Sequence, residues 1–181
     1  MLHIKVPITS EGWDEENEVF IEPTYLTLQL EHSLVSLSKW ESKWCKPFLS
    51  KVDKTDEEVM DYIKCMTITQ NVHPNIYDRL TRENIDQIND YIEAPMTATT
   101  FSGPESRTRS REIVTAELIY YWMISLNIPF ECQKWHINRL LALIKVCNVK
   151  NQPPRRMSNR ERISHYAALN EKRRKQFNSK G

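Results

Sequence analysis

The residues of this chain that could carry chemistry include two clusters of carboxylates. Asp14, Glu15 and Glu16 stand together near the start, and Glu57 and Glu58 stand side by side further along. Neighbouring carboxylates can act as general acid and base or bind a metal ion. Glu57 and Glu58 fall in the first turn of a predicted helix, where the helix dipole favours negative charge, so we interpret them as structural. The first cluster lies in a predicted loop and is expected to be solvated.

Cysteine and histidine offer a second kind of chemistry. Cys132 and His136 are four residues apart and could share one face of a helix, as two zinc ligands do. Zinc needs three or four ligands, and a nucleophilic cysteine paired with a histidine needs a further group that orients the histidine. The other histidines are scattered singly and are His3, His32, His73 and His165. We therefore predict no catalytic residues and no metal site.

Glycine is too scarce for the common phosphate-binding loops. The chain has only three glycines, far apart from one another, whereas a Walker loop, a dinucleotide fingerprint and a nucleophile elbow each need at least two close together. No cofactor is predicted, and the chain is not expected to be an enzyme. The four cysteines form no C-x-x-C pair and are expected to be reduced. No signal peptide and no run of 18 apolar residues occurs, so the cytoplasm is the predicted location and no membrane is expected as a partner.

Positive charge is concentrated toward the C-terminal end. Residues 150–181 hold ten Lys or Arg against two Glu, a net charge of +8, whereas residues 1–149 carry a net charge of −7. Such opposite charges can attract each other within the chain or between copies, and the basic segment can also bind an external polyanion. The candidate partner-binding cations are Arg107, Arg109, Arg111, Arg155, Arg156, Lys172, Arg173, Arg174 and Lys175.

The identity of a polyanionic partner stays open between nucleic acid and protein. Lysine and arginine neutralise phosphates and would give binding that depends on salt but little on sequence. No zinc finger, RNP-type aromatic motif or clear helix-turn-helix pattern is present. An acidic protein surface is therefore favoured over nucleic acid.

Tryptophans supply the other candidate partner surface. Trp40 and Trp44 are four residues apart and would form one stripe on a helix. A packed aromatic core is the favoured interpretation of these residues. Because indole rings also anchor interfaces, the exposed edge of the Trp40/Trp44 stripe is the candidate partner surface.

The elements that position these residues begin with an extended region over residues 1–32. Residues 3–8, 18–22 and 25–30 are short β-prone runs, and the last alternates apolar with polar residues. They predict a small hairpin or a three-stranded sheet, with the acidic stretch between the first two runs as a separator. Two or three strands are marginal alone, so this region is expected to pack on the helices or on a partner.

A helical core domain is predicted over residues 33–149. A helix of about eleven residues should start after Ser33 and end before Pro47, and capping residues Thr55 and Thr81 should open two more. A short helical piece is expected around Ile76, Tyr77 and Leu80. The predicted buried positions of the two capped helices are Val59, Tyr62, Ile63, Met66, Ile85, Ile88, Tyr91 and Ile92.

The second half of the core domain begins with a long loop over residues 94–110, which is expected to be functional or mobile. Residues 112–126 are apolar nearly all round and predict the central buried helix, which Pro129 ends. Residues 134–149 predict the next helix.

The basic arm over residues 150–181 follows a Pro-Pro hinge and begins its helix at a capping box on Ser158. This helix should run to Phe177 with a thin apolar stripe. The predicted fold is therefore mainly α, a helical bundle with a small extended or β-hairpin N-terminal region and a basic C-terminal helical arm.

Several segments of the chain resemble a family of phage proteins. Residues 38–44 read SKWESKW and are followed by KPFL, and similar likenesses occur at residues 112–122, 131–141 and 157–174. These segments resemble small proteins encoded among the tail genes of tailed bacteriophages, commonly described as tail assembly chaperones or tail morphogenesis proteins. The likeness covers about two thirds of the chain.

This resemblance implies a non-enzymatic helical protein of the host cytoplasm. It would bind the tape-measure protein or tail-tube subunits while the tail assembles, and a homo-oligomer is compatible with that role. Two alternatives stay open: a nucleic-acid-binding phage protein that uses the basic arm, and a structural tail or neck component that remains in the virion.

Overall fold

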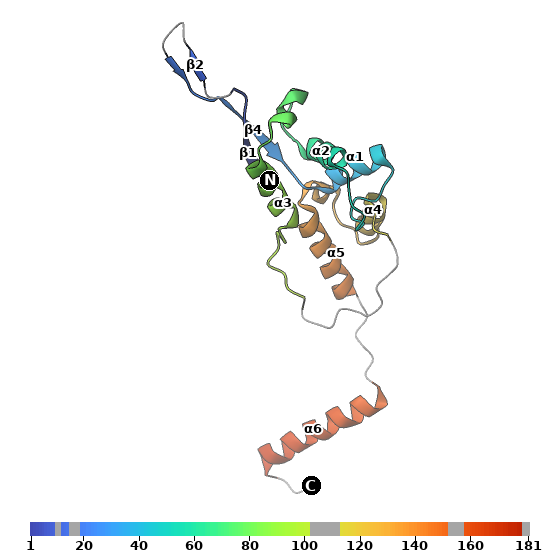
Figure 1. The fold of residues 1–181 in the computed structure, drawn as a ribbon. Coiled ribbons are helices and arrows are strands. Elements are labelled where there is room, and N and C mark those ends of the chain that lie inside the picture. Colours follow the sequence, from blue (N-terminus) through green and yellow to red (C-terminus); the bar gives the residue numbers. More distant parts are fainter. Residues whose placement is uncertain (10–11, 15–18, 102–112, 152–157, 179–181) are drawn as a thin grey trace. The chain divides into compact units, whose positions relative to one another are not determined.

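The fold is mainly helical, with a small antiparallel β region at the N-terminus, as the sequence predicts (Figure 1). The computed structural model describes residues 1–9, 12–14, 19–101, 113–151 and 158–178 of the chain. Within these ranges, no helix is long and apolar enough to span a membrane.

Four strands form two separate two-stranded sheets. β1 (Leu2–Pro7) pairs antiparallel with β4 (Tyr25–Leu30) along the whole length of both strands. β2 (Gly12–Asp14) pairs with β3 (Val19–Ile21). The predicted hairpin is confirmed, whereas the alternative three-stranded sheet does not form among the described residues of this region. β2 lies in the acidic stretch and pairs with β3, the next strand along the chain. The sequence did not predict it, because apolar and polar residues do not alternate there.

The β1–β4 ladder buries one of its faces against the helices. Side chains on that face alternate along each strand with exposed or half-buried ones, which is the pattern of a sheet with one solvated side. The residues buried from the two strands are Ile4, Val6, Leu28 and Leu30.

The first two long helices start where the local signals predict. α1 (Leu34–Trp44) begins after Ser33, whose hydroxyl accepts the N–H of the residue three positions on. α2 (Asp56–Met66) begins with a complete capping box, in which the side chains of Thr55 and Glu58 each accept the other's backbone N–H. Each cap satisfies backbone donors that the first turn leaves free, so it fixes the start of its helix.

One predicted core position of α2 is wrong. Val59 is exposed, whereas Tyr62, Ile63 and Met66 are buried as expected. The neighbouring Glu58 takes the buried position at this edge of the helix because its carboxylate is hydrogen-bonded there.

A 3₁₀ helix and a third α-helix complete the first half of the chain. η1 (Pro74–Arg79) is the predicted short helical piece, and it buries Ile76 and Tyr77. α3 (Arg82–Glu93) opens with a capping box between Thr81 and Asn84. Its predicted apolar face is confirmed, because Ile88 and Tyr91 are buried and Ile85 and Ile92 pack against the same core.

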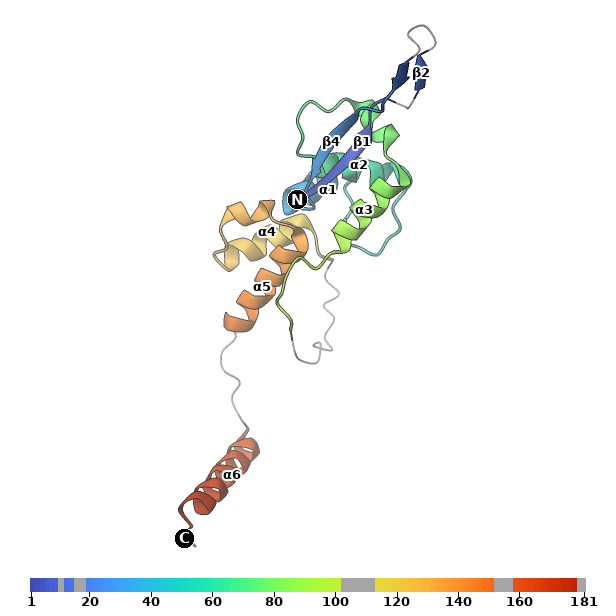
Figure 2. The same ribbon diagram turned by 90° about the vertical axis from the view of Figure 1, so that its left-hand side faces the viewer.

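The helix predicted to be central is neither as long nor as buried as expected. α4 (Ala116–Ser125) starts four residues later than predicted, and only Ala116, Ile119 and Met123 are buried in it. η2 (Phe130–Lys134) and α5 (Ile137–Asn151) follow, so α5 starts three residues later than predicted. Figure 2 shows α4 and the start of α5 side by side.

The central position belongs to α1 instead. Trp40 packs into one apolar core with the β1–β4 ladder, α2, η1 and α3. Leu34 and Leu37, in the first turns of the same helix, pack into a second core with α4, η2 and α5. α1 is therefore the element that joins the two cores, and α4 covers only one side of it.

The chain divides into two compact units between Asn148 and Val149. The second unit contains one long helix, α6 (Asn159–Phe177), whose start after Ser158 and end at Phe177 agree with the prediction. The described side chains of α6 are exposed except Leu169, which is half-buried. A helix with so little buried surface has no core of its own and depends on partners or on local charge pairs.

Candidate interaction surfaces

Trp40 lies in the core, which is the alternative that the sequence favours. Its side chain is 1% exposed, and its indole N–H donates to the Glu58 carbonyl oxygen at 2.8 Å. The Phe48 ring meets it edge-on at 5.0 Å between centroids. Trp44 stacks on it at 6.2 Å and is half-buried. Of the predicted Trp40/Trp44 edge, only Trp44 is partly accessible to solvent.

Two ion pairs hold the end of α1 to α2. The Lys43 ammonium bonds the Asp61 carboxylate, which also accepts the Trp44 indole N–H at 2.9 Å. Burial opposes ionisation of Asp61, but these hydrogen bonds outweigh it and lower its pKa. The Lys46 ammonium bonds Glu58 in the same way and, with the cap contact, lowers the pKa of that carboxyl. Both carboxylates are therefore structural anions, as the sequence predicts for Glu58.

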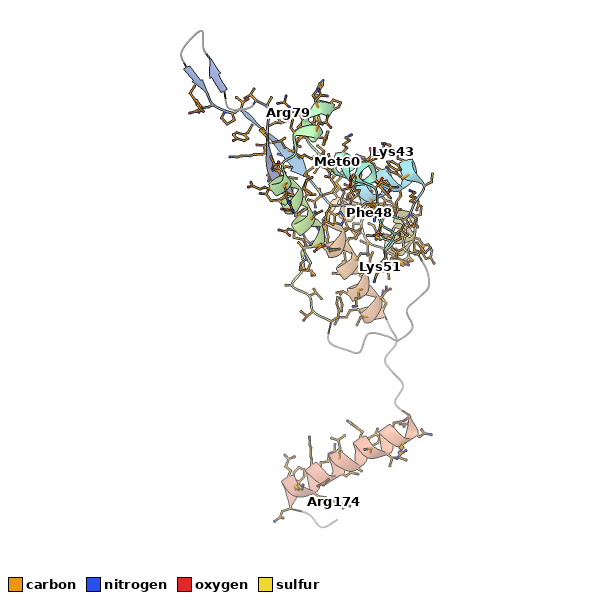
Figure 3. The ribbon with its side chains drawn as sticks, in the orientation of Figure 1. Lys43, Phe48, Lys51, Met60, Arg79 and Arg174 are labelled. Carbon is orange, nitrogen blue, oxygen red and sulfur yellow. The ribbon has the colours of Figure 1, made fainter. Side chains whose placement is uncertain are left out.

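A pocket of about 290 Å³ lies above Trp40. Its walls are mainly apolar and include Pro47, Val52 and Ile113. Its charged lining residues are two lysines and two carboxylates, namely Lys46, Lys54, Asp53 and Glu58. The Lys54 ammonium lies 4.7 Å from the centroid of the Phe48 ring. Figure 3 labels Phe48 and Lys51 in the segment that follows α1. Other residues of this segment, Pro47, Ser50 and Val52, line the pocket.

A second, more open pocket of about 510 Å³ adjoins the start of α1 and the end of α2. Lys39, Cys65, Ile68 and Lys134 are among its lining residues. Burial raises the pKa of the Cys65 thiol, so this cysteine is protonated near neutrality and is a poor nucleophile. This pocket is therefore an open surface depression lined partly by charged side chains, and its cysteine does not make it a reactive site.

Two histidines meet in the core between the aromatic side chains. The rings of His32 and His136 lie 5.0 Å apart, and His32 Nδ1 shares a hydrogen bond of 2.5 Å with the Tyr62 hydroxyl. His136 Nε2 donates to the Tyr91 carbonyl oxygen at 2.9 Å. Burial, with His136 as a second cause, lowers the pKa of His32 to about 3, and burial also lowers the pKa of His136. Both rings are neutral at pH 7.

Cys132 and His136, which by their spacing could have shared one face of a helix, are not part of the same helix. Cys132 lies in η2, whereas His136 precedes α5 and is turned toward His32. Among the residues that the structure describes, no three histidine, cysteine or carboxylate side chains come together in a group that could hold a metal ion.

The described part of the basic arm is exposed. Lys172, Arg173, Arg174 and Lys175 all lie on the surface of α6, and Figure 3 marks Arg174 on that helix. Lys175 pairs with Glu171 one turn earlier at 2.8 Å. The other predicted cations lie outside the described residues and are Arg107, Arg109, Arg111, Arg155 and Arg156.

The outer face of α4 is an apolar surface that the sequence pattern did not identify. Tyr121 is 62% exposed and Ile124 is 60% exposed, three positions apart on one side of the helix. Phe130, at the start of η2, is also exposed, and its ring lies 6.5 Å from that of Tyr120. A helix that is apolar all round cannot reveal which of its sides the rest of the fold covers.

Comparisons of the chain with models of known families, with curated proteins and with solved structures found no match. The function is therefore inferred from the surfaces of the chain itself, together with the sequence resemblance to phage tail proteins.

Proposed function

We propose that the protein is a non-enzymatic assembly factor that binds an apolar helical segment of another protein. We propose, from the resemblance to phage tail proteins, that this role belongs to tail assembly in the host cytoplasm and that the tape-measure or tail-tube protein is the client. The observation that carries the proposal is the exposed outer face of α4, formed by Tyr121 and Ile124.

This face has the properties of an interface centre. A large aromatic and a large aliphatic residue on the same side of one helix leave apolar surface exposed to water. Association would bury this surface and gain about 25 cal/mol of free energy per Å². Tyrosine is enriched among residues that dominate binding energy, because it buries a large ring and keeps a hydroxyl for hydrogen bonding. An amphipathic client helix laid along α4 would cover both side chains.

The fold presents α4 as a fixed platform. The Glu41 carboxylate, buried at the centre of the molecule's first unit, accepts the Ala116 N–H at 2.7 Å and the Phe48 N–H at 2.8 Å. The first of these contacts caps the start of α4, where the helix dipole favours an anion. A client would therefore meet a helix already held in place, which reduces the entropy lost on binding.

The basic arm favours a second candidate function. Four consecutive cations on an exposed helix are the footprint of a phosphate-binding segment, so a nucleic-acid-binding phage protein is the alternative. A structural tail or neck component would use the same surfaces but stay in the finished particle.

Co-purification separates these candidates. Tagged full-length protein would be expressed with the tail genes and recovered with and without nuclease, beside a chain that ends at Asn151. We expect tape-measure or tail-tube protein to co-purify in both conditions and to be lost from a variant carrying Tyr121→Ser and Ile124→Ser.

The matched control for that variant is Ile163→Ser, which removes an exposed isoleucine from α6 and should leave client capture unchanged. Recovery of nucleic acid alone, abolished by the truncation, would replace the proposal with the nucleic-acid function. Stable presence of the protein in purified particles would favour the structural role.

A further inference from the structure

The exposed face of α4 carries a carboxylate beside its apolar side chains. Glu117 lies four positions before Tyr121 and seven before Ile124, so the three residues share one side of the helix. All three are exposed. Glu117 forms no ion pair with another described residue. The apolar side chains therefore have an unpaired negative charge next to them.

Glu117 is not needed to cap its helix. The Glu41 carboxylate accepts the Ala116 N–H. The Thr115 hydroxyl accepts the Leu118 N–H, so the first turn already has side-chain acceptors. The helix dipole favours a carboxylate at this position, but no hydrogen bond within the described residues holds it. The Glu117 carboxylate is therefore available to a partner.

A second carboxylate lies next to the aromatic part of this surface. Glu131 follows Phe130, whose exposed ring adjoins Tyr120 of α4. Glu131 is exposed and forms no ion pair with another described residue. Residues 113–131 contain these two carboxylates and no lysine, arginine or histidine.

The cations that follow this segment in the chain belong to other surfaces. Lys134 lines the pocket at the start of α1, and Arg139 lies over the Trp135 ring at 4.2 Å. Arg111 precedes α4 and lies outside the described residues. Within the described residues, the charge carried by α4 and the start of η2 is therefore negative, as is the net charge of −7 on residues 1–149.

We propose that the α4 face selects a basic amphipathic helix, in which lysine or arginine residues border the apolar stripe. This inference rests on the proposed function and names the chemistry of its client. Opposite charges around an apolar centre guide the encounter and fix the register of the two helices. An acidic helix would place like charges together, so the same carboxylates select against it.

Two synthetic helical peptides test this charge preference. They share one stripe of leucines at helical spacing and differ only at the flanking positions, which are lysine in one peptide and glutamate in the other. The full chain is titrated into each labelled peptide at low salt, and fluorescence anisotropy measures the affinity. The basic peptide should bind about tenfold more tightly, because exposed attractions replace exposed repulsions. This ratio should shrink at about 0.5 M salt, since salt screens exposed charges.

Charge reversal in the protein tests whether the preference belongs to α4. A chain with Glu117→Lys and Glu131→Lys should bind the acidic peptide more tightly than the basic one. The matched control carries Glu83→Lys and Asp86→Lys on α3, which change the net charge by the same amount. It should keep the preference for the basic peptide. All four positions are exposed, so neither variant opens a core.

Three results would overturn the proposal. They are equal binding of both peptides by the unaltered chain, binding of neither peptide, and a preference for the basic peptide that survives charge reversal at Glu117 and Glu131. The proposed function has a separate readout in the capture of tail proteins. Capture that is lost in the Tyr121→Ser, Ile124→Ser variant but unchanged by charge reversal would keep α4 as the client face and remove only its charge preference. Self-association of the full chain through Tyr121 and Ile124 would assign the face to a second copy instead.

Discussion

Glu41 connects α1 to two other segments of the fold through its carboxylate. It lies on α1, is buried, and its two carboxylate oxygens accept backbone N–H groups from the segment after α1 and from the start of α4. No sequence pattern distinguishes it, because its partners Phe48 and Ala116 are seven and 75 positions away. Contacts at such separations depend on the tertiary fold and cannot be predicted from local propensity.

Replacing Glu41 by Ala should destabilise the first unit by about 2 kcal/mol or more, because two buried N–H groups would lose their acceptor. Glu41→Gln should cost less, since its amide oxygen can still accept one of them. Glu57→Gln on the exposed side of α2 is the control and should change little. The free energy of unfolding in urea measures all three; equal stability of Glu41→Ala and the unaltered chain would contradict this account.

The histidine pair should make stability depend on pH. The lowered pKa values of His32 and His136 mean that the unfolded chain binds protons between about pH 6.5 and the folded pKa, while the folded chain does not. The full contribution of the two neutral histidines to the free energy of unfolding is therefore present above pH 6.5. It decreases as the pH falls, by at most about 1.4 kcal/mol per pH unit for each histidine.

Urea unfolding between pH 7 and pH 5 measures this slope before the carboxylates Glu58 and Asp61, with their lowered pKa values, begin to contribute. His32→Gln should be less stable than the unaltered chain at pH 7 but should show a shallower slope. The groups that face the pair are the hydroxyl of Tyr62, the carbonyl of Tyr91 and the charge of Glu31. An unchanged slope in the variant would exclude His32 as its cause.

At the scale of elements, local sequence signals predicted where helices start better than they predicted which helix faces are buried. Ser33, Thr55 and Thr81 cap their helices as expected because a cap needs only residues within one turn. The burial of α4 was wrong for the opposite reason. Its apolar residues occur on every side, and only the positions of α1 and α5 decide that Met123 is buried and Tyr121 is exposed.

The division of the chain between Asn148 and Val149 makes a prediction about α6 as an element. A chain that ends at Asn151 should unfold at the same urea concentration as the full chain, because α6 contributes no residue to either apolar core. Circular dichroism would follow the transition, with the lost helical signal matching the 19 residues of α6. A clearly lower midpoint for the shortened chain would show that the arm stabilises the first unit.

The first unit of the molecule has two apolar cores, and it also carries apolar side chains that neither core buries. Composition alone revealed the opposite charges of the molecule's two parts. Trp40 is core, as the favoured interpretation of the tryptophan stripe has it, and the outer face of α4 is a candidate surface that the sequence pattern did not identify. The central claim is that this α4 face binds the client.

Calorimetric titration of purified tape-measure protein into the full chain tests that claim most directly. We expect binding by the unaltered protein, affinity at least tenfold weaker for the Tyr121→Ser, Ile124→Ser variant, and no change for the Ile163→Ser control, because only the first variant removes the exposed apolar face. Repeating the titration with tail-tube protein covers the second proposed client. Binding that is equally tight in all three chains, or absent with both clients, would contradict the account.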